Sequence, residues 1–343
     1  MNGPARLGVV ALAMAAAILP TPDAIVERWY SNGIYAWFQP ALTTISNLVP
    51  VALFDVICVM ALIATIVMIR RRVSSAGWRR GGLAAATTLV TAAAVIYLVF
   101  LATWGLNYRR LPLRDKLRFE PARLNASATN NLALQVASEM NRLYLRAHGE
   151  QFSIKDLAAA FQSAEASLRV ARPTVLGRPK PTIFGGYFHH AAIAGMTDPF
   201  FLETLVAPDL LDVERPFVIA HEWGHLAGYA DESEANFIAW LACRRGSARA
   251  QYSAWLALFG HVYAAAGSDR DVFRELDPGP RIDLRAIADR YARTSRIVRL
   301  AARETYDRYL RANRVEHGVE SYDDVVQLIL GTTFDASGNP QLR

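Results

Sequence analysis

The run HEWGHLAGYADESEANF occupies residues 221–237 and carries the clearest indication of chemistry in the chain. Its first five residues place His221 and His225 one helical turn apart, so both imidazoles can hold the same zinc ion. Glu222 lies beside them, where it can take a proton from water next to the metal. The flanking residues are uncharged, which suits a buried helix. We therefore expect a zinc site with Glu222 as its catalytic base.

A third metal ligand is expected after Gly228, which marks the end of the first helix. Glu232 and Asn236 are one turn apart in the helix that follows, on one of its faces. Glu232 is therefore the predicted third ligand, and Asn236 is predicted to support a ligating histidine. Glu234 and Asp231 stay open as alternatives, because a helix dipole also favours acidic residues that have no other role in a first turn.

The positive charge of the chain is confined to its first third. The 343 residues carry a formal net charge of +6. Residues 1–110 hold nine arginines against three acidic residues, and the remaining 233 residues hold 28 positive and 28 negative charges. A neutral C-terminal part has no charge excess with which to bind a polyanion. We therefore expect no nucleic-acid partner.

Three apolar runs in this basic third predict membrane-spanning helices. Residues 49–69 contain one charge, Asp55, and residues 82–104 contain none, so each run can cross a bilayer. The shorter run at residues 7–19 is expected as a first membrane helix, with a cleaved signal peptide as the alternative. Asp55 is expected near the outer interface of its span.

The arginines between these runs predict the orientation of the chain. Five arginines lie between residues 70 and 80, and positive loops tend to stay in the cytoplasm. The residues from about 105 onward are then outside the cytoplasm. The chain is thus expected as a multi-pass protein of the bacterial inner membrane, with an extracytoplasmic domain over residues 111–343.

This second domain is predicted to be mostly helical. Apolar spacing predicts helices over residues 127–147 and 153–170, with Ser127 and Ser153 as N-caps. Residues 182–206 mix large apolar residues with glycines and predict one or two strands, with a turn at Asp198-Pro199. Further helices are expected in three places: from Pro216 onward, over residues 283–313, and over residues 322–330.

The run at residues 221–237 also resembles the signature of a bacterial family of membrane proteins of unknown function. Members of that family have three N-terminal transmembrane helices and a gluzincin-like motif, HExxH followed by ExEAN. Several other segments share the likeness: YSNGIY (30–35), the region of Pro50 and Asp55, WGLNYRR (104–110), GMTDPFFLE (195–203) and YLRANRVEHGVESYDDVV (309–326). The chain departs from the family pattern at Trp223 and Gly224, where aliphatic residues are usual, and at Asp231, where a basic residue is common.

The resemblance implies a zinc-dependent peptidase fold. The expected fold class is therefore mainly α: a three-helix transmembrane region over residues 1–110, followed by an α+β zincin-like (gluzincin) domain with a small sheet. The expected function is a membrane-anchored zinc metalloendopeptidase that hydrolyses peptide bonds of envelope proteins or peptides. Its expected partners are that peptide or protein substrate and the lipid bilayer.

In the expected mechanism, Zn²⁺ on two histidines and a carboxylate lowers the pKa of water toward about 7, and Glu222 accepts the proton. The region 184–203 is expected to supply an edge strand that pairs with the substrate. The developing oxyanion needs a hydrogen-bond donor, and the candidates are Tyr229, His189, His190, His261 and Tyr322. The alternative function is a non-hydrolytic, zinc-stabilised membrane sensor or partner-binding domain. Glu222 favours the enzyme, because a purely structural zinc site needs no base.

Overall fold

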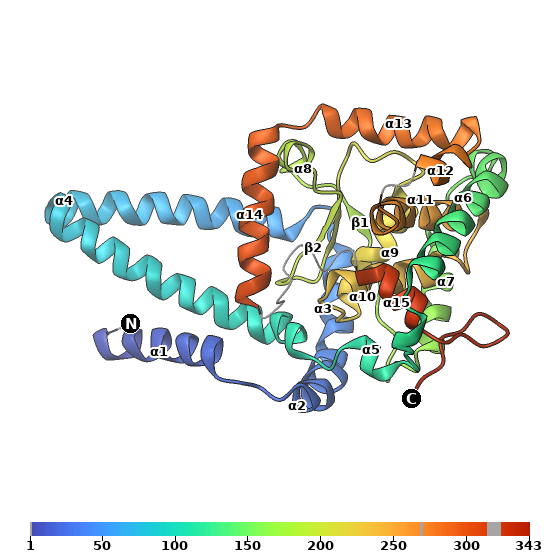
Figure 1. Ribbon diagram of the computed structural model, residues 1–343. Helices are drawn as coiled ribbons and strands as arrows, with labels where there is room; N and C mark the ends of the chain where they lie inside the picture. The colour runs from blue at the N-terminus through green and yellow to red at the C-terminus, as the bar shows by residue number, and fades with distance from the viewer. Residues whose placement is uncertain (1, 268–269, 314–323) are drawn as a thin grey trace.

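The computed structural model describes residues 2–267, 270–313 and 324–343, most of which lie in helices (Figure 1). The N-terminal part is built from α1 (Gly3–Ile18), α2 (Asp23–Ile25), the π-helix η1 (Val26–Tyr35), α3 (Ala36–Leu48), α4 (Leu53–Thr103) and the 3₁₀ helix η2 (Gly105–Arg109). The later helices are α5 (Leu113–Lys116), η3 (Pro121–Arg123), α6 (Ala126–Gly149), α7 (Ile154–Ser167), α8 (Gly185–Ala191), α9 (Arg215–Leu226), α10 (Glu232–Cys243), α11 (Ala248–Ala265), α12 (Arg270–Arg274), α13 (Pro278–Ala292), α14 (Arg296–Ala312) and α15 (Asp324–Gly331).

The prediction of three membrane helices, over residues 7–19, 49–69 and 82–104, is wrong. Among the described residues, α4 is the one helix that is long and apolar enough to cross a membrane, and it contains most of both longer runs. The helix continues through the arginine-rich stretch, with a non-helical backbone at Gly77 (φ 73°). Figure 1 shows the two arms of α4 meeting in a bend at the end far from the sheet and the C-terminal helices.

The first apolar run forms α1, which does not stand as a span of its own. Its 16 residues reach about 24 Å at 1.5 Å per residue, which is less than the roughly 30 Å of a bilayer core. Together with residues 23–48 it would pass as a single span, but the two parts are bent by 110°. The described chain therefore offers one candidate membrane helix, or two if this bent pair is counted.

Helix α10 is the centre of the folded part. All of its residues are buried, and it packs against α9, α7, α11 and α15. A helix that is apolar on nearly every side is stable only where its apolar surface is buried in a core. Because α10 begins at Glu232, this packing also places the start of the helix, with its acidic residues, deep in the molecule.

The sheet is small and has the strand order β1–β3–β2. β1 (Pro179–Lys180) pairs with β3 (Thr204–Val206) in parallel, and β2 (Gly195–Thr197) pairs with β3 in an antiparallel register. The predicted turn at Asp198-Pro199 joins β2 and β3, as expected, whereas the first part of the predicted strand region forms α8. The expected α+β zincin-like class is therefore corrected to a mostly helical fold with one three-stranded sheet.

Helix boundaries agree with the sequence where a cap is local. The Ser153 hydroxyl accepts a hydrogen bond from the backbone of Asp156 at 3.2 Å and caps α7, as predicted. The preceding helix begins earlier than predicted, and its cap is Asn125, which accepts from Ala128 at 2.9 Å, rather than Ser127. Both caps satisfy a free N–H at a helix start.

The single helix expected over residues 283–313 is two helices, α13 and α14. The break lies at residues 293–295, and Ser295 caps α14 by accepting from the backbone of Val298. Helix α15 corresponds to the last predicted helix, although residues 322 and 323 lie outside the described residues. Helix α14 matters for the site, because the break frees it to change direction after α13 (Figure 1).

A buried ion pair attaches the start of α4 to the sheet. Lys180 on β1 contacts Glu203, beside β3, and their side chains are 1% and 0% exposed. The second Glu203 oxygen accepts from the backbone N–H of Phe54 at 3.0 Å. Asp55, which was expected near the outer membrane interface, is buried and accepts from the Thr182 hydroxyl at 2.7 Å. Buried polar contacts thus hold the start of the apolar helix α4 to the folded part.

Replacement of Glu203 by glutamine is expected to destabilise the protein by about 3–5 kcal/mol, because the Lys180 ammonium would remain buried without its counter-charge. Chemical denaturation of the purified protein in detergent measures this. The matched control is Glu304→Gln, which breaks the solvent-exposed Arg308–Glu304 pair on α14 and should change stability little. Equal effects of the two substitutions would show that the buried pair does not stabilise this junction.

Candidate metal centre

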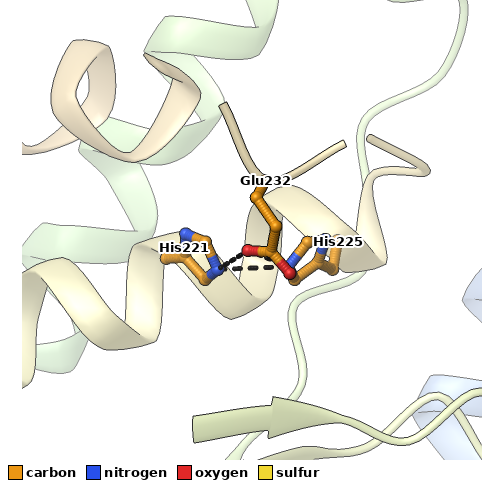
Figure 2. A group of neighbouring side chains, drawn as sticks. All are labelled: His221, His225 and Glu232. Atoms are coloured by element: carbon orange, nitrogen blue, oxygen red, sulfur yellow. Dashed lines mark hydrogen bonds and ion pairs between the residues drawn. The ribbon is translucent and has the colours of Figure 1, made fainter. Parts of the chain in front are cut away.

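Two histidines of α9 and one glutamate of α10 bring three potential ligand atoms together (Figure 2). Nε2 of His221 lies 3.1 Å from Nε2 of His225 and 3.1 Å from Oε2 of Glu232. Nε2 of His225 lies 3.5 Å from the same oxygen. A tetrahedral zinc ion with bonds of about 2.0–2.1 Å needs ligand atoms about 3.3–3.4 Å apart. The observed separations therefore suit a zinc ion.

Hydrogen bonds on the far side of each ring orient the two histidines. Nδ1 of His221 pairs with Oδ1 of Asn236, and Nδ1 of His225 pairs with the carbonyl of Tyr229, each at 2.8 Å. Both partners are acceptors, so each Nδ1 carries a proton, and each Nε2 presents its lone pair when the ring is neutral. Oε2 of Glu232 is buried and has no hydrogen-bond donor. Three potential ligand atoms thus converge on one point, which is the environment a cation requires.

The two alternative carboxylates have other partners. Asp231 is the N-cap of α10 and accepts from the backbone of Ser233 at 2.9 Å and of Glu234 at 3.2 Å. The carboxylate of Glu234 accepts from the backbone N–H of Leu113 at 2.5 Å. The structure therefore brings Glu232 to the histidines, together with Asn236, and turns Asp231 and Glu234 to structural hydrogen bonds.

The electrostatics of this group are dominated by its burial. Burial disfavours charge on both Glu232 and His225, but each stabilises the charge of the other. The pKa of Glu232 is consequently held well below its usual value, and that of His225 is raised to about 9. A buried carboxylate in this position stays ionised only beside a positive charge.

Glu222 lies between α9 and the edge strand β2. Its carboxylate contacts the hydroxyl of Thr197 at 2.9 Å. A Cβ atom at Gly195 would lie 2.7 Å from Oε1 of Glu222, so a larger residue there would require the Glu222 carboxylate to move. Burial raises the pKa of the Glu222 carboxyl, while the two histidines and the Thr197 hydrogen bond oppose that rise.

The C-terminal end of α9 is held by residues from the first third of the chain. The indole N–H of Trp104 donates to the His225 carbonyl at 2.9 Å, and the Tyr35 hydroxyl donates to the Leu226 carbonyl at 2.7 Å. Arg110 donates to the Gly228 carbonyl at 2.8 Å and pairs with Glu27. These bonds satisfy carbonyls that a helix end leaves free. The apolar N-terminal part and the candidate site are therefore packed against each other.

Tyr306 on α14 is a site residue that the sequence did not indicate. Its hydroxyl donates to Oε1 of Glu232, whereas Oε2 of the same carboxylate is the oxygen that contacts the two histidines. No spacing rule connects a residue of α14 with a residue of α10, 74 positions earlier. Thr197 belongs to the segment GMTDPFFLE, whose likeness to the bacterial family was the only sequence signal for it.

The five oxyanion candidates lie in different places. Tyr229 is buried and contacts His225 through its carbonyl. His189 pairs with Asp209 at 2.7 Å, and the His190 ring lies 5.0 Å from that of His189. His261 lies on α11. The fifth candidate, Tyr322, is outside the described residues.

Comparison with known proteins finds a family that matches most of the chain. A family model described as "Protein of unknown function (DUF3810)" matches residues 30–330. The chain belongs to this family. The matched part of the chain includes all of the residues that meet at the candidate site. No curated protein and no solved structure matches the chain.

The two glutamates of α10 are expected to differ in their effect on metal binding. Loss of a residue that only supports a ligand lowers metal affinity by about 10–100-fold. Glu232→Gln should lower zinc affinity by more than this, because it removes a charged ligand. Glu234→Gln is the matched control and should leave affinity unchanged. Competition with a chromophoric chelator measures both. The assignment would be wrong if the Glu234 variant, and not the Glu232 variant, lost zinc.

Proposed function

We propose that this DUF3810 protein is a membrane-anchored zinc metallopeptidase. The observation that carries the proposal is the convergence of two imidazole nitrogens and one carboxylate oxygen beside a buried second carboxylate, Glu222. Among the described residues this group contains three potential ligands, and catalytic zinc sites typically combine three protein ligands with one open position. A closed structural site would more often have four protein ligands.

The site residues divide the chemistry between them. A zinc ion held by His221, His225 and Glu232 would act as a Lewis acid and lower the pKa of nearby water toward about 7. Glu222 would accept the proton of the attacking water at its carboxylate and pass it to the leaving amine. Thr197 would hold that carboxylate in place by the hydrogen bond at 2.9 Å.

The substrate would be an extended peptide. Strand β2 lies at the edge of the sheet and carries Gly195 and Thr197, the two residues next to Glu222. A peptide that adds to an exposed sheet edge gains main-chain hydrogen bonds whatever its sequence. Binding along β2 would bring a peptide carbonyl close to Glu222. Envelope proteins and peptides are the substrates that fit the proposed location.

The proposed location is the bacterial cytoplasmic membrane, with the catalytic part outside the cytoplasm. The two apolar arms of α4 would lie in the bilayer, and the arginines between residues 70 and 80 would lie on the cytoplasmic side, in agreement with the positive-inside tendency. The exposed apolar side chains of α4 support this placement. They would be in contact with lipid rather than with water.

Glu222→Gln is expected to keep zinc and to lose peptide hydrolysis by about 10²–10⁴-fold, because a general base contributes a factor of that size. His225→Ala should lose both. The measurements are metal analysis of the purified full-length protein and cleavage of a broad peptide library analysed by mass spectrometry. A wild-type protein that binds no zinc would refute the proposal.

Cysteine labelling tests the orientation. Ser75→Cys, in the exposed bend of α4, should react with a membrane-impermeant maleimide only after the cytoplasm is opened. Ser337→Cys, in an exposed C-terminal turn, should react in intact spheroplasts. The background is the protein with Cys58 and Cys243 replaced, which are its two cysteines. The reverse pattern would place the candidate site in the cytoplasm.

A second candidate function is a non-hydrolytic zinc-stabilised sensor or partner-binding domain. The contact between Trp104, which follows α4, and the His225 carbonyl favours it, because a shift of the membrane helix would reach a ligand residue directly. Zinc retained in both wild type and Glu222→Gln, with no cleavage by either, would favour this function over hydrolysis.

A further inference from the structure

Helix α14 places one phenol on the metal ligand Glu232. The two oxygens of this carboxylate have different surroundings: Oε2 faces the two histidine nitrogens, and Oε1 accepts from the Tyr306 hydroxyl. Glu232 is 3% exposed, so water cannot supply these bonds freely. A carboxylate without a donor on Oε1 could rotate about its last bond and exchange its two oxygens.

We propose that Tyr306 is a positioning residue of the metal centre, which fixes Glu232 as a ligand through one oxygen. The proposal rests on the zinc site proposed above and adds a residue from a helix outside the α9–α10 pair. A donor on Oε1 makes that oxygen a poorer ligand and keeps Oε2 directed at the histidines. Hydrogen bonds to a ligating carboxylate act in this way on metal affinity.

An aromatic cluster holds Tyr306 in place. Its ring stacks on Tyr309, with centroids 5.8 Å apart and an interplanar angle of 20°. Tyr309 in turn meets Phe100 and Tyr108, each at 5.9 Å. Tyr108 lies 5.2 Å from Trp104, edge to face.

This aromatic cluster connects the end of α4 with two of the proposed metal ligands, His225 and Glu232. Trp104 donates to the carbonyl of His225, and Tyr306 donates to the carboxylate of Glu232. Aromatic pairs in such offset and edge-to-face arrangements stabilise their relative positions. The Tyr306 hydroxyl is therefore held at the ligand by packing, and does not depend on the flexibility of an exposed side chain.

The test compares zinc affinity in full-length wild type, Tyr306→Phe and Tyr291→Phe. Tyr306→Phe keeps the ring and its stacking but removes the donor, so zinc affinity should fall by about 10–100-fold. Tyr291→Phe removes a hydroxyl from α13, away from the ligands, and should bind zinc as wild type does. Thermal unfolding of the metal-free proteins shows whether each variant is folded at the assay temperature; a modest loss of stability is expected for Tyr306→Phe, because it leaves a buried carboxylate oxygen without its donor.

The outcomes separate this inference from the zinc site itself. Wild type that binds zinc, with Tyr306→Phe binding it equally well, would overturn the role of Tyr306 and leave the site intact. Equal losses in both tyrosine variants, or a loss of zinc binding only where metal-free Tyr306→Phe is unfolded at the assay temperature, would also overturn it. Wild type that binds no zinc would overturn both proposals.

Discussion

The buried carboxylate of Glu232 is the constraint on which the rest of the site depends. An ionised carboxylate removed from water is strongly destabilising unless positive charge and hydrogen-bond donors surround it. Here two imidazoles face Oε2 and a phenol donates to Oε1. Each of those partners is itself fixed by a further bond, to Asn236, to the Tyr229 carbonyl or to an aromatic cluster. The geometry is consequently set before any ligand binds.

The apolar N-terminal part contributes to this preorganisation. Trp104 and Tyr35 donate to the last carbonyls of α9, and Arg110 donates to the carbonyl of Gly228 just beyond it, so the end of the helix that carries His225 is held by residues of the first third of the chain. Arg110 also pairs with Glu27, which neutralises one of the arginines in the basic first third. The five arginines at the bend of α4 differ, because the structure shows no anionic partner for them among the described residues.

Local spacing accounts for what could be predicted of the site. His221, Glu222 and His225 share a helix, and so do Glu232 and Asn236, so helical periodicity alone places each set on adjacent turns. Periodicity could not choose between the acidic residues at the start of α10, since Asp231, Glu232 and Glu234 stand within four positions. The choice follows from the N-cap role of Asp231 and from the hydrogen bond between Glu234 and Leu113.

The sequence by itself determined the helix pair that carries the motif, the cap at Ser153 and the turn between β2 and β3, because hydrogen bonds and side chains a few residues apart decide such features. Only the tertiary structure decided that the two long apolar runs form one bent helix, that residues 185–191 are helical, and that Tyr306, Thr197 and Trp104 meet the site. Those contacts join segments tens to more than a hundred residues apart, and their energy comes from burial and packing that no local pattern records.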